Sequence, residues 1–292
     1  MRFANAGSHV TVAELGNARL ASHPVRRASN GIAYRMLGEG PPLLLLHGGS
    51  GSWLHWWRNI EALSARHQVM AIDLPGLGDS DDVPPDILVE DYIDRVVQAL
   101  RESGNARTGL DILAFSFGGF IGAGVAAQLG AAARRVMLIS PSGFAKAEGR
   151  QLGRRHRSTF AQDAAGERDY LKHLLLSTLL ADENSVDEDA ITIQRVNMSK
   201  ARFQNANANF SLSNRLPEFL SRIHGSLMLV YGDFDRTAYP SVDARIETCR
   251  EVRPDILVQR IPGAGHWSQF EKPADVNALA DRFFAGANRD TR

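Results

Sequence analysis

One serine of this sequence stands where a catalytic nucleophile is expected. Ser116 lies in LAFSFGG (residues 113–119), which follows an apolar run and opens a helix-like stretch of small residues. Ala114 and Gly118, two positions to either side, allow a sharp turn without side-chain collisions, as in the G-x-S-x-G nucleophile elbow. The pattern predicts a nucleophile at a strand-to-helix turn, with a serine that only caps the helix as the alternative.

A serine nucleophile needs a general base and an acid that orients the base. Among the nine histidines, His266 lies directly after the last apolar run, where a loop can reach back to the serine. Two aspartates follow the apolar run 227–231, and the connection SPSG (residues 140–143) contains no carboxylate. We predict Asp235 as the acid, with Asp233 as the alternative.

A glycine-rich segment, HGGSGS (residues 47–52), follows the apolar run LLLL. Backbone N–H groups that face a substrate carbonyl stabilise the oxyanion of acyl transfer, and glycines let the backbone approach a ligand closely. We predict Gly49 and Phe117 as the two donors, with Gly48 as the alternative to Gly49. His47 is expected to brace the loop.

Buried strands alternating with helix-like stretches must position these residues. Short apolar runs that end at glycines or turns predict strands at residues 43–46, 69–72, 110–115, 136–139, 227–231 and 256–261. Asn30-Gly31 predicts a hairpin turn before them. This alternation predicts an α/β fold with a mostly parallel sheet and helices on both faces. The carboxyl edge of such a sheet would bring the serine, the acid and the base together.

The alternation of strands and helices is interrupted once. Residues 142–219 contain no convincing buried strand and are too long for a loop, so we predict a helical cap inserted into the sheet domain. Residues 23–141 and 220–292 would form the α/β core, and residues 1–22 a loosely attached N-terminal segment. Side chains near the glycine loop and in the cap are candidates for substrate binding: Trp53, His55, Trp267, Arg195, Arg202 and the polar Asn197.

Composition limits the functional classes. The 292 residues carry 33 basic and 33 acidic side chains, so no electrostatic attraction to nucleic acid is expected. A single cysteine, no signal-like start and no apolar run of membrane-spanning length predict a cytoplasmic protein that does not enter the membrane. Neither a P-loop nor an H-E-x-x-H motif occurs. We therefore expect a small-molecule substrate and no cofactor or metal, and leave a homodimer open.

Five segments together resemble the α/β-hydrolase superfamily, from about residue 24 to the C-terminus apart from the insertion: AFSFGG, LLLLHGGSGS, AIDLPGLGDSD, VYGDFD and GAGHWSQFEKP. The chain order serine, aspartate, histidine is also that of these enzymes. Two of the segments are similar to carbon–carbon bond hydrolases that act on meta-cleavage products of aromatic rings. Those enzymes usually carry asparagine where this chain has Phe115. The HGG segment is also similar to proline iminopeptidases, and esterases and lactonases are the broadest match.

Three functions follow as hypotheses. The first is hydrolysis of a small carboxylic ester through an acyl-enzyme. The second is carbon–carbon bond cleavage by the same three residues, in which Arg195 or Arg202 would bind a substrate carboxylate. The third is a non-catalytic ligand receptor on the same fold.

Overall fold

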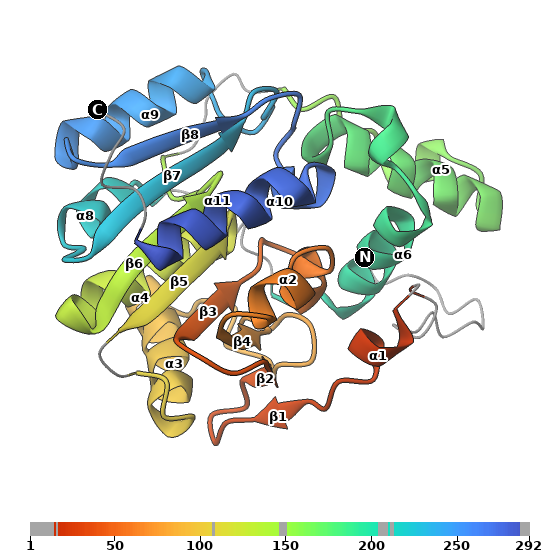
Figure 1. Cartoon of the computed structure of the whole chain (residues 1–292). Helices are drawn as coiled ribbons and strands as arrows, with labels where there is room; N and C mark the ends of the chain where they lie inside the picture. Colours follow the sequence, from red (N-terminus) through yellow and green to blue (C-terminus); the bar gives the residue numbers. More distant parts are fainter. Residues whose placement is uncertain are drawn as a thin grey trace.

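The computed structural model describes residue 15, residues 17–106, 109–145 and 151–203, residue 210 and residues 213–286. One sheet of eight strands runs through this part of the chain in the order β1-β2-β4-β3-β5-β6-β7-β8 (Figure 1). The strands are β1 (Arg26–Arg27), β2 (Ala33–Leu37), β3 (Pro42–Leu46), β4 (Gln68–Ile72), β5 (Leu110–Phe115), β6 (Ala133–Ile139), β7 (Ser226–Gly232) and β8 (Leu257–Ile261). All neighbours from β4 to β8 pair in parallel, while β1 with β2 and β2 with β4 pair antiparallel.

Helices cover both faces of the sheet (Figure 1). On one face lie α3 (Val89–Glu102), α4 (Phe117–Leu129), α8 (Leu216–Ser221) and α9 (Val242–Val252). On the other face lie α2 (Ile60–Ser64), α10 (Ser268–Glu271) and α11 (Pro273–Ala285). The predicted α/β fold with a mostly parallel sheet is confirmed, and the two covered faces explain why the central strands are mostly apolar.

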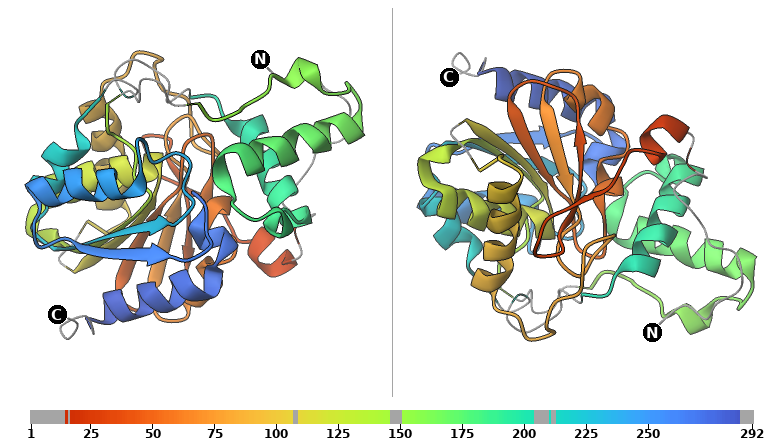
Figure 2. Two further views of the ribbon diagram at one scale, coloured as in Figure 1. Left: turned by 90° about the horizontal axis from the view of Figure 1, so that it is seen from above. Right: turned by 90° about the horizontal axis from the view of Figure 1, so that it is seen from below.

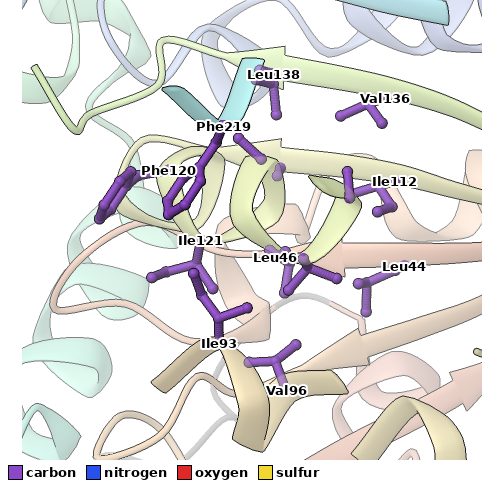
Figure 3. Close-up of a cluster of buried hydrophobic side chains, with 14 of the residues drawn as sticks. Leu44, Leu46, Ile93, Val96, Ile112, Phe120, Ile121, Val136, Leu138 and Phe219 are labelled. Carbon is purple, nitrogen blue, oxygen red and sulfur yellow. The ribbon is translucent and has the colours of Figure 1, made fainter. Parts of the chain in front are cut away.

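Apolar side chains fill the space between the sheet and the α3–α4 layer. Figure 3 shows aliphatic side chains of β3, β5 and β6 facing those of α3 and α4, with Phe219 of α8 beside Phe120. The rings of Phe120 and Phe219 stack with their centroids 5.5 Å apart. All six residues of β5 are buried, and the strand lies between β3 and β6 inside the sheet. The turn at Ser116 therefore begins at the end of a central strand.

Every strand expected from the six apolar runs is present, and Asn30-Gly31 joins β1 to β2 as a hairpin. Between β6 and β7 the described residues form no strand. They form α5 (Ala164–Leu174), a π-helical turn (Leu175–Leu179) and α6 (Glu188–Lys200), which project from one side of the molecule in both views of Figure 2. The boundary expected at residue 219 falls inside α8, which packs on α4 and α9.

The N-terminal segment is packed where the structure describes it. Leu15 and Leu20 are buried in the same apolar cluster as the residues of α2 and α11, although α1 (Ala18–Ala21) is only four residues long. A loose attachment was expected because residues 1–22 show little periodicity. Residues 1–14 and 16, most of that segment, lie outside the described residues.

We predict that Gly118 cannot be replaced without loss of stability, because a Cβ there would lie 2.3 Å from the carbonyl oxygen of His47. Backbone at the end of β3 cannot yield as a side chain can, so Gly118→Ala should lower the free energy of unfolding by about 1–3 kcal/mol. Gly124→Ala in the same helix is the control, because the nearest contacts of its Cβ would be side-chain atoms, Cδ1 of Ile93 at 2.3 Å and the Phe219 ring at 3.2 Å, rather than backbone. Urea unfolding of both variants checks this, and equal losses would contradict it.

Candidate active site

Ser116 occupies strained backbone at the turn between β5 and α4. Its φ of 53° and ψ of −117° lie outside the regions that residues with side chains normally adopt. Its N–H donates to the Ile139 carbonyl at 2.9 Å, and its own carbonyl accepts from the N–H groups of Ser142 at 3.0 Å and Phe120 at 3.2 Å. The strain is therefore maintained by the chain that continues from β6, and the serine side chain is only partly buried.

The structure brings Ser116, His266 and Asp235 together. The Nε2 atom of His266 lies 2.9 Å from the Oγ atom of Ser116. Its Nδ1 atom lies 2.9 Å from Oδ2 and 3.1 Å from Oδ1 of Asp235. His266 comes from the loop after β8 and Asp235 from the loop after β7, so three parallel strands deliver the three side chains to one edge of the sheet.

The carboxylate of Asp235 is held in its charged form. Its burial opposes the charge, but the nearby His266 and the hydrogen bonds from His266 and Thr237 outweigh this and lower the pKa of Asp235 to about 2. A carboxylate facing Nδ1 requires a hydrogen on Nδ1, which leaves the lone pair of Nε2 directed at Ser116. Asp233, the alternative acid, instead pairs with Arg260 at 2.9 Å.

The glycine loop lies directly against the turn that carries Ser116. A Cβ on Gly48 would lie 2.9 Å from the Phe115 ring and 3.2 Å from the Cβ of Ser116. The N–H of Gly48 donates to Nδ1 of His55 at 3.1 Å. The Gly49 amide donates to no described residue, and the Phe117 amide opens α4, where an N–H has no acceptor within the helix. The geometry thus favours Gly49 over Gly48 as an oxyanion donor.

Two buried, neutral histidines support this loop. Nδ1 of His47 donates to the Gly48 carbonyl, and its Nε2 accepts from the Leu74 N–H, both at 2.8 Å. Burial lowers the pKa of His47 to about 4, although its bond to Gly48 opposes the shift. Burial, His47 and His266 together lower the pKa of His55 well below its ordinary value. Both rings are uncharged at neutral pH, as their acceptor roles require.

Trp53, His55 and Trp267, expected to bind substrate, are buried supports of the loops. Trp267 stacks on Phe270 at a centroid distance of 4.1 Å, and its Nε1 donates to the His55 carbonyl at 3.0 Å. Trp53 is 2% exposed and packs under the guanidinium of Arg35 at 4.3 Å. These contacts tie Trp267 to His55, just after the glycine loop, and Trp53 to Arg35.

Two buried carboxylates that tie the site to its surroundings were missed in the sequence. Asp73 accepts from the Trp53 N–H at 2.7 Å, and burial raises its pKa to about 6 despite nearby Arg35. Glu271 accepts from the Gly265 N–H at 2.5 Å and from the N–H groups of Ala181 and Asp182 at 2.7 and 2.9 Å. For Asp73 the available signal was an acidic residue inside an otherwise apolar segment, AIDL (residues 71–74).

The three polar candidates of the insertion are engaged within the protein. Arg195 pairs with Glu167 at 3.2 Å. Arg202 pairs with Asp82 and donates to the backbone carbonyls of the loop around Gly78. Asn197, 1% exposed, accepts at 2.6 Å from the hydroxyl of Ser52 in the glycine loop. Of these three, Asn197 is the one whose side chain bonds to the glycine loop within the described residues.

The profile of a family described as the alpha/beta hydrolase family matches residues 43–279. The chain belongs to the alpha/beta hydrolase family. This membership confirms the resemblance found in the sequence and supports the expected enzyme class, a hydrolase.

The comparisons with individual proteins are weaker. This alpha/beta hydrolase is 26% identical over 260 residues to a dihydrolipoyllysine-residue acetyltransferase component of an acetoin cleaving system from Cupriavidus necator, covering 85% of the chain and 65% of that relative. The chain covers 39% of the length of a second relative. It therefore spans less than two thirds of the length of each of these two relatives.

Solved structures share the fold. A Rhodococcus esterase superposes with a TM-score of 0.72 at 21% identity, over 91% of this chain and 99% of the other. A meta-cleavage product hydrolase from Pseudomonas fluorescens superposes with a TM-score of 0.67 at 21% identity, over 88% of this chain and 95% of the other. In the part of the hydrolase that the structure describes, no cluster of three metal-binding side chains occurs and no helix is long and apolar enough to cross a membrane.

We predict that His47 makes stability depend on pH. In the unfolded chain a histidine binds a proton below about pH 6.5, whereas the pKa of folded His47 is about 4, so the unfolded state binds more protons between these values. Stability should fall as the pH drops, by about 2 kcal/mol from pH 7 to pH 5 for this group. In urea unfolding at both pH values, His47→Gln should reduce the difference, while the exposed His224→Gln should retain it. An unchanged difference in His47→Gln would refute the prediction.

Proposed function

We propose that this protein is a serine hydrolase that cleaves a small, neutral carboxylic ester through an acyl-enzyme. The observation that carries the proposal is the continuous arrangement from Asp235 through His266 to the strained Ser116, with both hydrogen-bond distances at 2.9 Å. A receptor without catalysis has no need of a nucleophile in strained backbone.

In the proposed acylation step, the Oγ atom of Ser116 attacks the ester carbonyl carbon while Nε2 of His266 takes the serine proton. Asp235 stabilises the resulting imidazolium through Nδ1–H. The amides of Gly49 and Phe117 donate to the oxyanion. Collapse of the tetrahedral intermediate breaks the ester C–O bond, and His266 gives its proton to the departing alcohol.

Deacylation repeats the chemistry with water. His266 takes a proton from the attacking water, the carbonyl oxygen again accepts from the two amides, and Ser116 regains its proton as the acid leaves. The same base serves both steps, so any residue that fixes the orientation of the imidazole acts on both.

A neutral substrate is favoured because the two arginines offered for a substrate carboxylate already have protein partners. Arg195 is paired with Glu167, and Arg202 is held by Asp82 and by the loop around Gly78. Recruiting either cation would break an existing ion pair and, for Arg202, also its hydrogen bonds to backbone carbonyls. Carbon–carbon bond cleavage of an acidic ring-fission product is therefore the less favoured alternative.

We further propose that the insertion acts as a cap. Its backbone meets the histidine loop, because the Trp267 N–H donates to the Leu179 carbonyl at 2.8 Å and Glu271 accepts from Ala181 and Asp182. Asn197 of α6 meets the glycine loop through Ser52. Contacts with two catalytic loops support a role of the insertion in enclosing the substrate.

The proposed activity is tested on the nucleophile. Ser116→Ala should lower kcat by about a million-fold if the three residues act as a unit. The measurement is turnover of p-nitrophenyl acetate together with covalent labelling by a fluorophosphonate, located by peptide mass spectrometry. Ser158→Ala, an exposed serine of the insertion, is the matched control and should leave both unchanged. Labelling at another serine, or undiminished turnover in Ser116→Ala, would rule out the assignment.

The choice of acid is tested with a matched pair. Asp235→Asn should lower kcat by about 10⁴-fold, because the imidazole loses its orienting anion and its correct tautomer. Asp233→Asn removes only the ion pair with Arg260 at the surface and should change kcat little. The same ester assay on both variants ranks them, and the reverse ranking would show that Asp233 is the acid.

A further inference from the structure

A threonine hydroxyl lies between the acid and the base. Thr237 Oγ1 is 2.7 Å from Oδ1 of Asp235 and 2.8 Å from Nδ1 of His266. The backbone N–H of Thr237 also donates to the same Oδ1 at 2.8 Å. The side chain thus contacts both members of the pair at distances as short as their own.

The positions of the hydrogens follow from charge. Asp235 is ionised, so it accepts from every neighbour that offers a proton, and Nδ1 of His266 carries a hydrogen. The hydroxyl has one hydrogen, which points to Oδ1 because Nδ1 cannot accept it. A lone pair of Oγ1 therefore faces Nδ1–H, and the imidazole hydrogen is shared by the carboxylate and the hydroxyl.

Local chain geometry places the hydroxyl there. Thr237 follows Asp235 by two residues, and the bond from its N–H to the Asp235 side chain closes an Asx turn. This turn directs the threonine side chain back toward its own aspartate. A valine would have the same shape but neither the donor nor the acceptor.

We propose that Thr237 is a positioning residue of the hydrolase reaction, whose hydroxyl donates to Asp235, accepts from His266 and so holds the imidazole with Nε2 facing Ser116. The proposal rests on the proposed function of these three residues. When His266 takes the serine proton, its ring becomes a cation. The lone pair of Oγ1 then accepts from the Nδ1–H of a charged donor. Hydrogen bonds of this kind are stronger to a charged donor than to a neutral one, so the contribution grows in the transition state.

Two substitution pairs isolate the hydroxyl. Thr237→Val keeps the shape of the side chain and removes the oxygen, whereas Thr237→Ser keeps the oxygen and removes the methyl group. If Thr237→Val does not fold, Thr237→Ala compared with Thr237→Ser gives the same information. Thr237→Val should lower kcat by about 10- to 100-fold and leave KM unchanged, because a hydrogen bond to a charged group is lost and no substrate contact is removed. Thr237→Ser should stay within about threefold of wild type.

The rate of fluorophosphonate labelling of Ser116 should fall in parallel with kcat in the variants without the hydroxyl. Thr248→Val, which removes a hydroxyl bonded to the Ala244 carbonyl within α9, is the matched control and should change neither rate. Thermal unfolding of each variant verifies that it is folded.

Three results would overturn the role of Thr237 while the proposed function stands: wild-type kinetics in Thr237→Val, equal losses in Thr237→Ser and Thr237→Ala, or a change in KM with kcat unchanged. A wild-type protein that is not labelled at Ser116 would overturn the proposed function, and this role with it.

Discussion

The close contact between the first turn of α4 and the backbone that leaves β3 is the constraint on which the site depends. Gly118 lies so near the His47 carbonyl that no side chain fits between them. This contact brings the turn that carries Ser116 against the glycine loop. Because β3 and β5 are neighbours in the sheet, their carboxyl ends place Ser116 and the loop amides side by side before any side chain contributes.

A second layer keeps these backbones in place with uncharged groups. His47 and His55 each hold the glycine loop through a ring nitrogen, and burial keeps both rings neutral. Neutral supports suit this position, since a cationic His55 could not accept from Gly48 and would repel the imidazolium formed on His266. The same burial that stabilises the loop at neutral pH makes it vulnerable at acidic pH, when unfolding lets the histidines bind protons.

Glu271 connects the histidine loop to the insertion. One carboxylate oxygen accepts from Gly265, next to the proposed base, and the other accepts from two consecutive amides after the π-helical turn of the insertion. A buried carboxylate with three backbone donors is well satisfied and hard to replace. The position of the insertion and the position of His266 therefore depend on the same side chain, which links the proposed cap to the proposed base.

The sequence by itself determined the sheet strands, the turn at Ser116 and the choice of His266, because buried parallel strands are continuous apolar runs and catalytic loops follow their carboxyl ends. It also ranked Asp235 above Asp233, a preference that the contact with His266 supports. Tertiary structure alone decided which polar groups meet. Arg202 is paired with Asp82, 120 residues away in the sequence, and Trp267 donates to the His55 carbonyl. Neither contact could be predicted, because pairing between distant segments leaves no local pattern in the chain. The same holds for Thr237: its spacing from Asp235 is visible in the sequence, but only the fold shows that its hydroxyl reaches His266.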